Sequence, residues 1–267
     1  WDAYYTHLIV PALLMFTWEI APANFRDNEL NIPESGNGIP DILDEAGWLL
    51  RFGYRTRHEI MKMGYGTGGL GLRVFGDLWG KDEAPEGTGR GSWEDNTRTW
   101  YVSGEDPYST YKYAALAAQM AFCLKTGGFT DSIDWKKEAV EAYTWAKNNT
   151  KTGDEGKHSL KEIRAYASAS LYRITEDDSY HQQLKTDVSG IGSSTYLKDE
   201  ARWAPYIYTN MPDSIPVDNT LYGLLKAAVL GTADNLVNVA SGRACRFGGD
   251  YSMPMLVGQA TTPWVLR

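Results

Sequence analysis

Apolar residues recur at helical spacing along most of this 267-residue chain, and this periodicity limits the possible folds more than any other feature. The clearest case is residues 39–54, where the apolar stripe consists of Ile39, Ile42, Leu43, Ala46, Leu49 and Leu50. Positions i, i+3, i+4 and i+7 share one face of an α-helix, so the stripe predicts a helix with one buried face. Similar patterns predict helices at 10–21, 109–126, 134–149, 159–174, 179–185, 218–230, 233–241 and 254–267.

Almost no segment alternates as a β-strand does, so we expect an all-α protein. Two long segments interrupt the helices. Residues 64–106 are rich in Gly, Trp and acidic side chains and predict an ordered loop with one hairpin at 70–75, and residues 186–217 predict a second loop. Long ordered loops in compact domains are often functional. Antiparallel helix pairs with long loops on one face are typical of an α/α toroid, and a helical bundle is the alternative.

Charge and composition restrict the partners. The net charge of -8 argues against a polyanion such as nucleic acid. Ten Trp and seventeen Tyr can fill a thick core or line a sugar cleft, and composition does not separate these uses. No apolar run reaches the ~18 residues of a membrane span, and no secretory signal is visible.

The cysteines and histidines give no metal site from their spacing. Cys123 and Cys245 lie in or beside apolar segments, so we expect buried free thiols. A disulfide between them is the alternative. No Cys/His set has zinc-ligand spacing.

Residues 31–52 read NIPESGNGIPDILDEAGWLLRF and combine turn formers with a group of carboxylates. Pro40 fits the first position of a helix, and Asp41, Asp44 and Glu45 would then face the positive end of its dipole. We favour this structural interpretation. The two catalytic carboxylates of a glycosidase face each other across a bound sugar, whereas Asp41 and Asp44 would lie side by side on one helix. A magnesium–diphosphate site of the terpene cyclase kind is the other alternative. The run DILDE lacks the two consecutive Asp residues that begin the Asp-rich motif of such sites.

The same stretch strongly resembles a segment of glycoside hydrolase family 9, in which NIPES, a turn and IPDLLDEA follow the first barrel helix. Leu30 to Trp48 match this pattern almost without change. Further matches are the helix with Tyr5, His7, Pro11, Trp18 and Glu19, the segment Asp106–Tyr111 and the segment Ala169–Thr175. The resemblance covers residues 1 to about 180 and is weaker beyond.

The resemblance implies an (α/α)6 barrel, incomplete here, in a single partial domain over residues 1–267. It implies an inverting hydrolase of β-linked glucan or related oligosaccharides, acting as an endoglucanase or from chain ends. The family's Asp-Ala-Gly-Asp base motif would lie before Trp1, and its Glu acid would lie beyond Arg267. We therefore expect scaffold and part of a cleft, no catalytic residue, and a piece of a longer protein. A non-catalytic carbohydrate-binding module of the same fold is the alternative, and a diphosphate-using cyclase is a third.

Five residues are candidates for substrate binding: Asp2, His7, Trp93, Trp203 and Tyr206. By the resemblance, Asp2 and His7 lie beside the base, although His7 can equally begin a helix. The three aromatic residues are predicted on long loops, where they can stack on sugars or pack the loop. The expected partner is a β-linked oligo- or polysaccharide. The sequence indicates no cofactor, calcium is not inferable from it, and a secreted or periplasmic location is implied by the resemblance only.

Overall fold

The computed structural model describes residues 7–76, 99–154 and 160–243. The helices of these ranges are α2 (Ile9–Ile20), α3 (Asp41–Lys62), α4 (Pro107–Gly127), α5 (Trp135–Asn149), α6 (Leu160–Thr175), α7 (Asp178–Asp187), α8 (Trp203–Thr209) and α9 (Asn219–Ser241). Two 3-10 helices, η1 (Pro22–Asn24) and η4 (Asp199–Arg202), accompany them. The strands β1 (Val74–Gly76) and β2 (Trp100–Val102) form an antiparallel ribbon.

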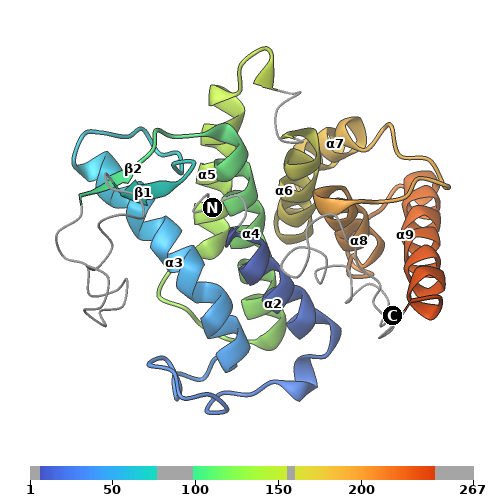
Figure 1. Cartoon of the computed structure of the whole chain (residues 1–267), viewed down its shortest axis with the longest axis horizontal. Helices are drawn as coiled ribbons and strands as arrows, with labels where there is room; N and C mark the ends of the chain where they lie inside the picture. Colours follow the sequence, from blue (N-terminus) through green and yellow to red (C-terminus); the bar gives the residue numbers. More distant parts are fainter. Residues whose placement is uncertain (1–6, 77–98, 155–159, 244–267) are drawn as a thin grey trace.

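The helices form consecutive pairs arranged in two rows. Each of α2, α4, α6 and α8 packs against the helix that follows it, and α2, α4 and α6 also pack against the next member of their own row. These four form the inner row, and α3, α5, α7 and α9 form the outer row. Figure 1 shows α4 near the centre of the array, between α3 and α6. The predicted all-α fold of helix pairs is confirmed.

The inner helices all begin at the same end of the array. Glu19, near the end of α2, binds Arg173 near the end of α6 at 2.6 Å, so these two inner helices run in parallel. The connections that precede α4, α6 and α8 therefore lie together, and we call this end the loop end. The connection at residues 21–40, between α2 and α3, lies at the opposite end.

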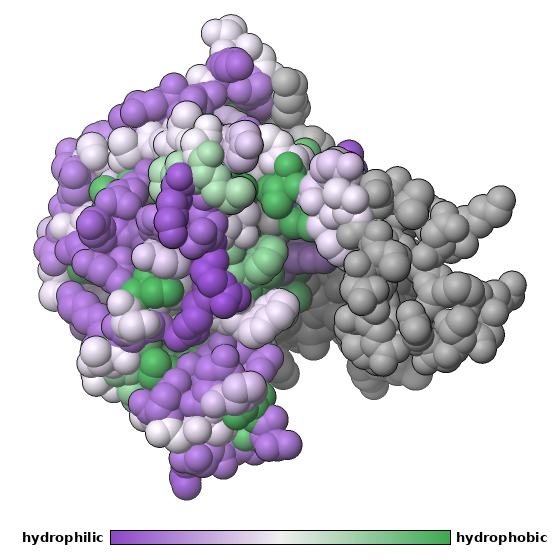
Figure 2. Space-filling model, turned by 90° about the vertical axis from the view of Figure 1, so that its left-hand side faces the viewer, coloured by the Kyte–Doolittle hydropathy of each residue, from purple (hydrophilic) through white to green (hydrophobic). Residues whose placement is uncertain are grey.

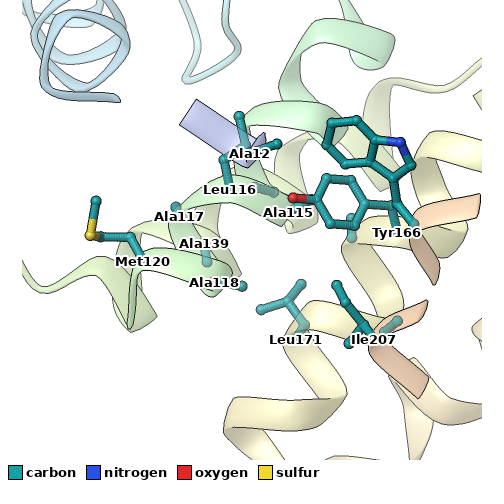
Figure 3. Close-up of a cluster of buried hydrophobic side chains, with 14 of the residues drawn as sticks. Ala12, Ala115, Leu116, Ala117, Ala118, Met120, Ala139, Tyr166, Leu171 and Ile207 are labelled. Carbon is teal, nitrogen blue, oxygen red and sulfur yellow. The ribbon is translucent and has the colours of Figure 1, made fainter. Parts of the chain in front are cut away.

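Helix α4 is the centre of the core. Its alanines are fully buried against neighbouring helices, as the close-up in Figure 3 shows for Ala115, Ala117 and Ala118. As predicted, Asp106 caps the helix by accepting a hydrogen bond from the Ser109 N–H at 2.7 Å. Gly128 ends the helix in the left-handed region, at φ 72°.

Several predicted boundaries are wrong. The predicted loop at 186–217 contains η4 and α8, and the two helices predicted at 218–230 and 233–241 are the single helix α9. The Thr232 hydroxyl donates to Ala228 and accepts from the Leu197 N–H, so tertiary contacts support α9 across the expected break. No hairpin forms within 70–75, because β1 pairs with the distant strand β2. The predicted helix at 254–267 lies outside the described residues.

The carboxylates of the 31–52 stretch hold the connection between α2 and α3. Asp41 is buried and accepts hydrogen bonds from the backbone N–H groups of Asn28, Glu29 and Leu30. Asp44 is also buried and accepts from the Asn37 amide at 3.0 Å. Both carboxylates therefore fix the loop at the end opposite the loop end. They have the predicted structural role, but they bind the preceding loop, and Pro40 is the N-cap of α3 rather than its first residue.

The Asp41→Asn variant tests this clamp. Burial opposes ionisation, but hydrogen bonds from Leu30, Ser35, Asn28 and Glu29 outweigh it and hold the pKa of Asp41 below its ordinary value of 3.8. The ionised form therefore stabilises the fold above that pH, and this contribution is lost as the pH falls. We expect the variant to melt at a lower temperature at pH 7, and the gap from wild type to shrink below about pH 4. A Glu45→Gln control, on an exposed neighbour, should match wild type.

Candidate functional site

A buried ion pair lies in the inner row towards the loop end. Lys112, in the first third of α4, has a side chain only 1% exposed, and its Nζ binds Glu200 Oε1 at 2.9 Å. Glu200 belongs to η4, in the connection that precedes α8. Nζ also lies 5.8 Å from the centre of the Trp203 ring, within reach of a cation–π contact. Burial lowers the pKa of Lys112, and the charge of Glu200 opposes this effect.

An aromatic cluster lies beside this pair. Phe16 of α2 contacts Trp203 and Tyr206 of α8 edge-on, with ring centres 5.5 and 5.2 Å apart. Tyr166 of α6 meets Trp203 at 5.0 Å. Because the rings come from three inner helices, the cluster fixes the spacing of the row.

A second polar network crosses the inner row nearer the opposite end. Glu19 receives hydrogen bonds from Arg173 of α6 and from the Gln119 amide of α4 at 2.8 Å. The Tyr166 hydroxyl donates to the Gln119 side-chain oxygen. The network thus joins α2, α4 and α6 through charged and polar groups that are shielded from water.

The structure brings two of the five predicted site residues together. Trp203 and Tyr206 lie on α8 rather than on a loop, and both are buried, with 3% and 8% of their surface exposed. His7 is exposed just before α2 at the loop end. Asp2 and Trp93 lie outside the described residues. Substrate binding by these five residues stays a prediction.

Sequence reasoning missed Lys112 and Glu200. The alanine-rich segment around Lys112 is typical of a helix that packs closely against its neighbours. A charged residue among apolar neighbours is unusual in such a helix. That single Lys within YSTYKYAALAAQMA was the available signal. Nothing in the sequence placed Glu200 opposite it, because the two are 88 positions apart.

An open pocket of about 500 Å³ lies where α6 meets α7 and α9 begins, and its lining includes Tyr172, His181, Lys185 and Asp218. The His181 ring is stacked between Tyr172 and Tyr208, and its Nε2 lies 2.8 Å from the Tyr208 hydroxyl. This hydroxyl also accepts the Asp218 N–H at the start of α9. His181 therefore ties α7 to α8 and α9.

Other kinds of site find little support in the described residues. No group of three or more His, Cys, Asp or Glu within them could hold a metal ion. None of their helices is long and apolar enough to cross a membrane. Cys123 is buried and free, as expected, and Cys245 lies outside the described residues. On the face in Figure 2, apolar side chains are scattered among hydrophilic ones.

Truncation of Trp203 measures its part in the packing. We expect Trp203→Ala to lower the free energy of unfolding by about 3–5 kcal/mol, because it opens a cavity between three helices. Urea denaturation measures this. Trp48, which is 62% exposed, provides the control, and Trp48→Ala should change stability by less than about 0.5 kcal/mol. Equal effects of the two truncations would show that the aromatic cluster does not support the row.

The pH dependence of stability tests the His181 contacts. Burial lowers the pKa of His181 below its ordinary value of 6.5; nearby Lys185 adds to this, while Asp178 and Asp218 oppose it. Below pH 6.5 the unfolded chain binds a proton that the folded chain resists, so stability should fall as the pH falls. The loss should be smaller in His181→Gln than in wild type, as measured by urea denaturation from pH 7.5 to 5.5. If the free energy of unfolding changed with pH by the same amount in both proteins, His181 would not be the source of the pH dependence.

Comparisons with known proteins agree on the fold. No protein-family model matches the chain. Endoglucanase C of Cellulomonas fimi is 23% identical over 244 residues, which are 85% of this chain and 21% of that protein. A metagenome-derived glycoside hydrolase family 9 endoglucanase superposes on 92% of the chain with a TM-score of 0.72 and 20% identity. The Bacteroides ovatus GH9 protein superposes with a TM-score of 0.69 and 18% identity, and family 9 endoglucanase J30 with a TM-score of 0.67 and 22% identity. Each superposition covers 93% of the chain.

The chain covers only 44–46% of these three solved structures. At these identities the superpositions establish the fold, and they confirm the resemblance read from Leu30 to Trp48. The chain therefore has the fold of the family 9 glycoside hydrolases, an (α/α)6 barrel, over less than half of their length.

Proposed function

We propose that the chain forms part of an inverting hydrolase of β-linked glucans, of the endoglucanase type. The observation that carries this proposal is the superposition on a family 9 endoglucanase over 92% of the chain. The match at Leu30–Trp48 supports it independently of the structure. We further propose that residues 1–267 belong to one partial barrel domain.

The proposed reaction is a single displacement. An Asp base activates water on one face of the sugar, and a Glu acid protonates the leaving oxygen on the other. The two carboxyl groups stand about 6.5–9.5 Å apart, which leaves room for the water. This chain would supply the barrel wall and substrate contacts at the loop end, where the candidates are Asp2, His7, Trp93, Trp203 and Tyr206.

Three described carboxylates at the loop end are engaged in structural contacts. Glu105 accepts hydrogen bonds from the N–H groups of Thr67, Gly68 and Gly69, each at 2.7 Å. Asp106 caps α4, and Asp187 binds the guanidinium of Arg164 at 2.6 and 2.9 Å. These contacts support the proposal that the base and the acid come from other parts of the barrel.

Two other functions remain as alternatives with less support. A magnesium–diphosphate site would need Asp41 and Asp44, but both hold the loop between α2 and α3. A non-catalytic carbohydrate-binding module would have the same fold and bind sugar without cleaving it. The coding sequence upstream of Trp1 distinguishes the two functions, because only the enzyme requires the two Asp residues of the Asp-Ala-Gly-Asp motif.

An assay of a longer protein that contains this chain tests the proposal. We expect it to release reducing ends from carboxymethylcellulose, and the first product seen by NMR should be the α-anomer, because inversion changes a β-linkage to an α-hydroxyl. The matched control carries Asn in place of the upstream Asp pair and should release nothing. Binding of cellohexaose without release of sugar would support the module instead.

A further inference from the structure

We propose that the outer face of α9 binds a second copy of the chain, and that the two α9 helices pair antiparallel about a twofold axis at Leu230. The outer face consists of seven residues: Gly223, Lys226, Ala227, Leu230, Ala233, Asp234 and Val237. The proposal concerns the outside of the helix array and does not depend on the proposed function.

The outer face is directed away from the core. α9 buries four side chains against the array: Leu225, Ala228, Thr232 and Leu236. Successive residues of an α-helix are about 100° apart, which places Leu230 and Val237 on the far side of α9 from these four. These two side chains are 54% and 45% exposed. α9 also forms the right-hand edge of the array in Figure 1, so a second molecule can approach this face.

The centre of the outer face is apolar, which is unusual for the exposed side of a surface helix. It is a line of Gly223, Leu230 and Val237, each seven residues from the next. On α5, another outer helix, every exposed residue is polar. α9 has two charged residues among its 23, Lys226 and Asp234, and both flank the apolar line. A seven-residue apolar spacing is typical of a helix that packs along a partner helix.

The outer face is complementary to itself in the antiparallel direction. In a twofold interface, each contact between two different residues occurs twice, once on each side of the axis. With the axis at Leu230, Lys226 lies level with Asp234 of the second copy, because both are four residues from the axis. Gly223 lies level with Val237 in the same way, so the small residue leaves room for the larger one. Opposite charges and unequal sizes therefore meet across the axis, which favours a second copy as the partner.

The two charges cannot satisfy each other within one chain. Lys226 and Asp234 are eight residues apart, which is about 12 Å along the helix. Lys226 Nζ instead lies 5.4 Å from the centre of the Tyr222 ring. Exposed ion pairs contribute little to affinity, so in the dimer they chiefly set the alignment of the helices. Burial of Leu230 and Val237 supplies the attraction.

Sedimentation equilibrium of the 267-residue chain tests the interface. We expect Leu230→Glu to raise the dissociation constant of the dimer about a hundredfold, because it places two like charges at the axis and removes the central apolar contact. The matched control is Leu30→Glu in the connection between α2 and α3, since Leu30 is 49% exposed. It should associate as wild type does. Circular dichroism verifies that both variants fold.

Charge reversal tests the alignment of the two helices. Lys226→Asp brings like charges together at both symmetric positions and should weaken the dimer about tenfold. Adding Asp234→Lys restores opposite charges across the axis, so the double variant should recover the wild-type affinity to within about twofold. Because the two positions do not touch within one chain, the recovery requires a contact between two copies.

A wild-type chain that stays monomeric at its highest soluble concentration would overturn the proposal. This result is expected if another segment of the chain, or of a longer protein, covers α9. Association that persists in Leu230→Glu would also overturn it, since another surface would then join the copies. A double variant that does not recover would overturn the antiparallel alignment. None of these results bears on sugar release by the longer protein.

Discussion

The close approach of helices around α4 is the constraint on which the rest of the structure depends. Its alanines at 114, 115, 117 and 118 are fully buried, so the neighbouring helices pack against a nearly smooth surface. Larger side chains there would force the rows apart, because protein interiors leave no spare volume. The polar groups that cross the inner row, above all Glu19 with Arg173, meet only because this spacing is short. The order of the pairs and the common loop end follow from the same packing.

The sequence predicted what is local and missed what is tertiary. The apolar stripe of α3 and the cap at Asp106 depend on neighbours within a few residues, and both appear as expected. The end of α3 was placed too early because its last turns depend on distant partners. Arg57 binds the Gly68 carbonyl at 2.8 Å and pairs with Glu138 of α5, which holds the helix as far as Lys62. No local pattern contains this information.

The candidate site shows the same division. An aromatic residue in a presumed loop was sufficient reason to choose Trp203, and the structure places it in the inner row beside the ion pair. Its burial could not be predicted, because it depends on Phe16 and Tyr166 from two other helices. Lys112 could have been noticed as a charge within an alanine-rich helix, but its partner could not have been named. The pairing with Glu200 joins segments whose distance is set only by the fold.

The two ends of the array use carboxylates in opposite ways. At the end opposite the loop end, Asp41 accepts hydrogen bonds from three backbone N–H groups, and its charge stabilises a loop. At the loop end, the donor to Glu200 among the described residues is the buried Lys112, which loses hydration to provide it. The two carboxylates therefore differ in what they join, since Asp41 holds one connection in place whereas Glu200 links the start of α8 to α4.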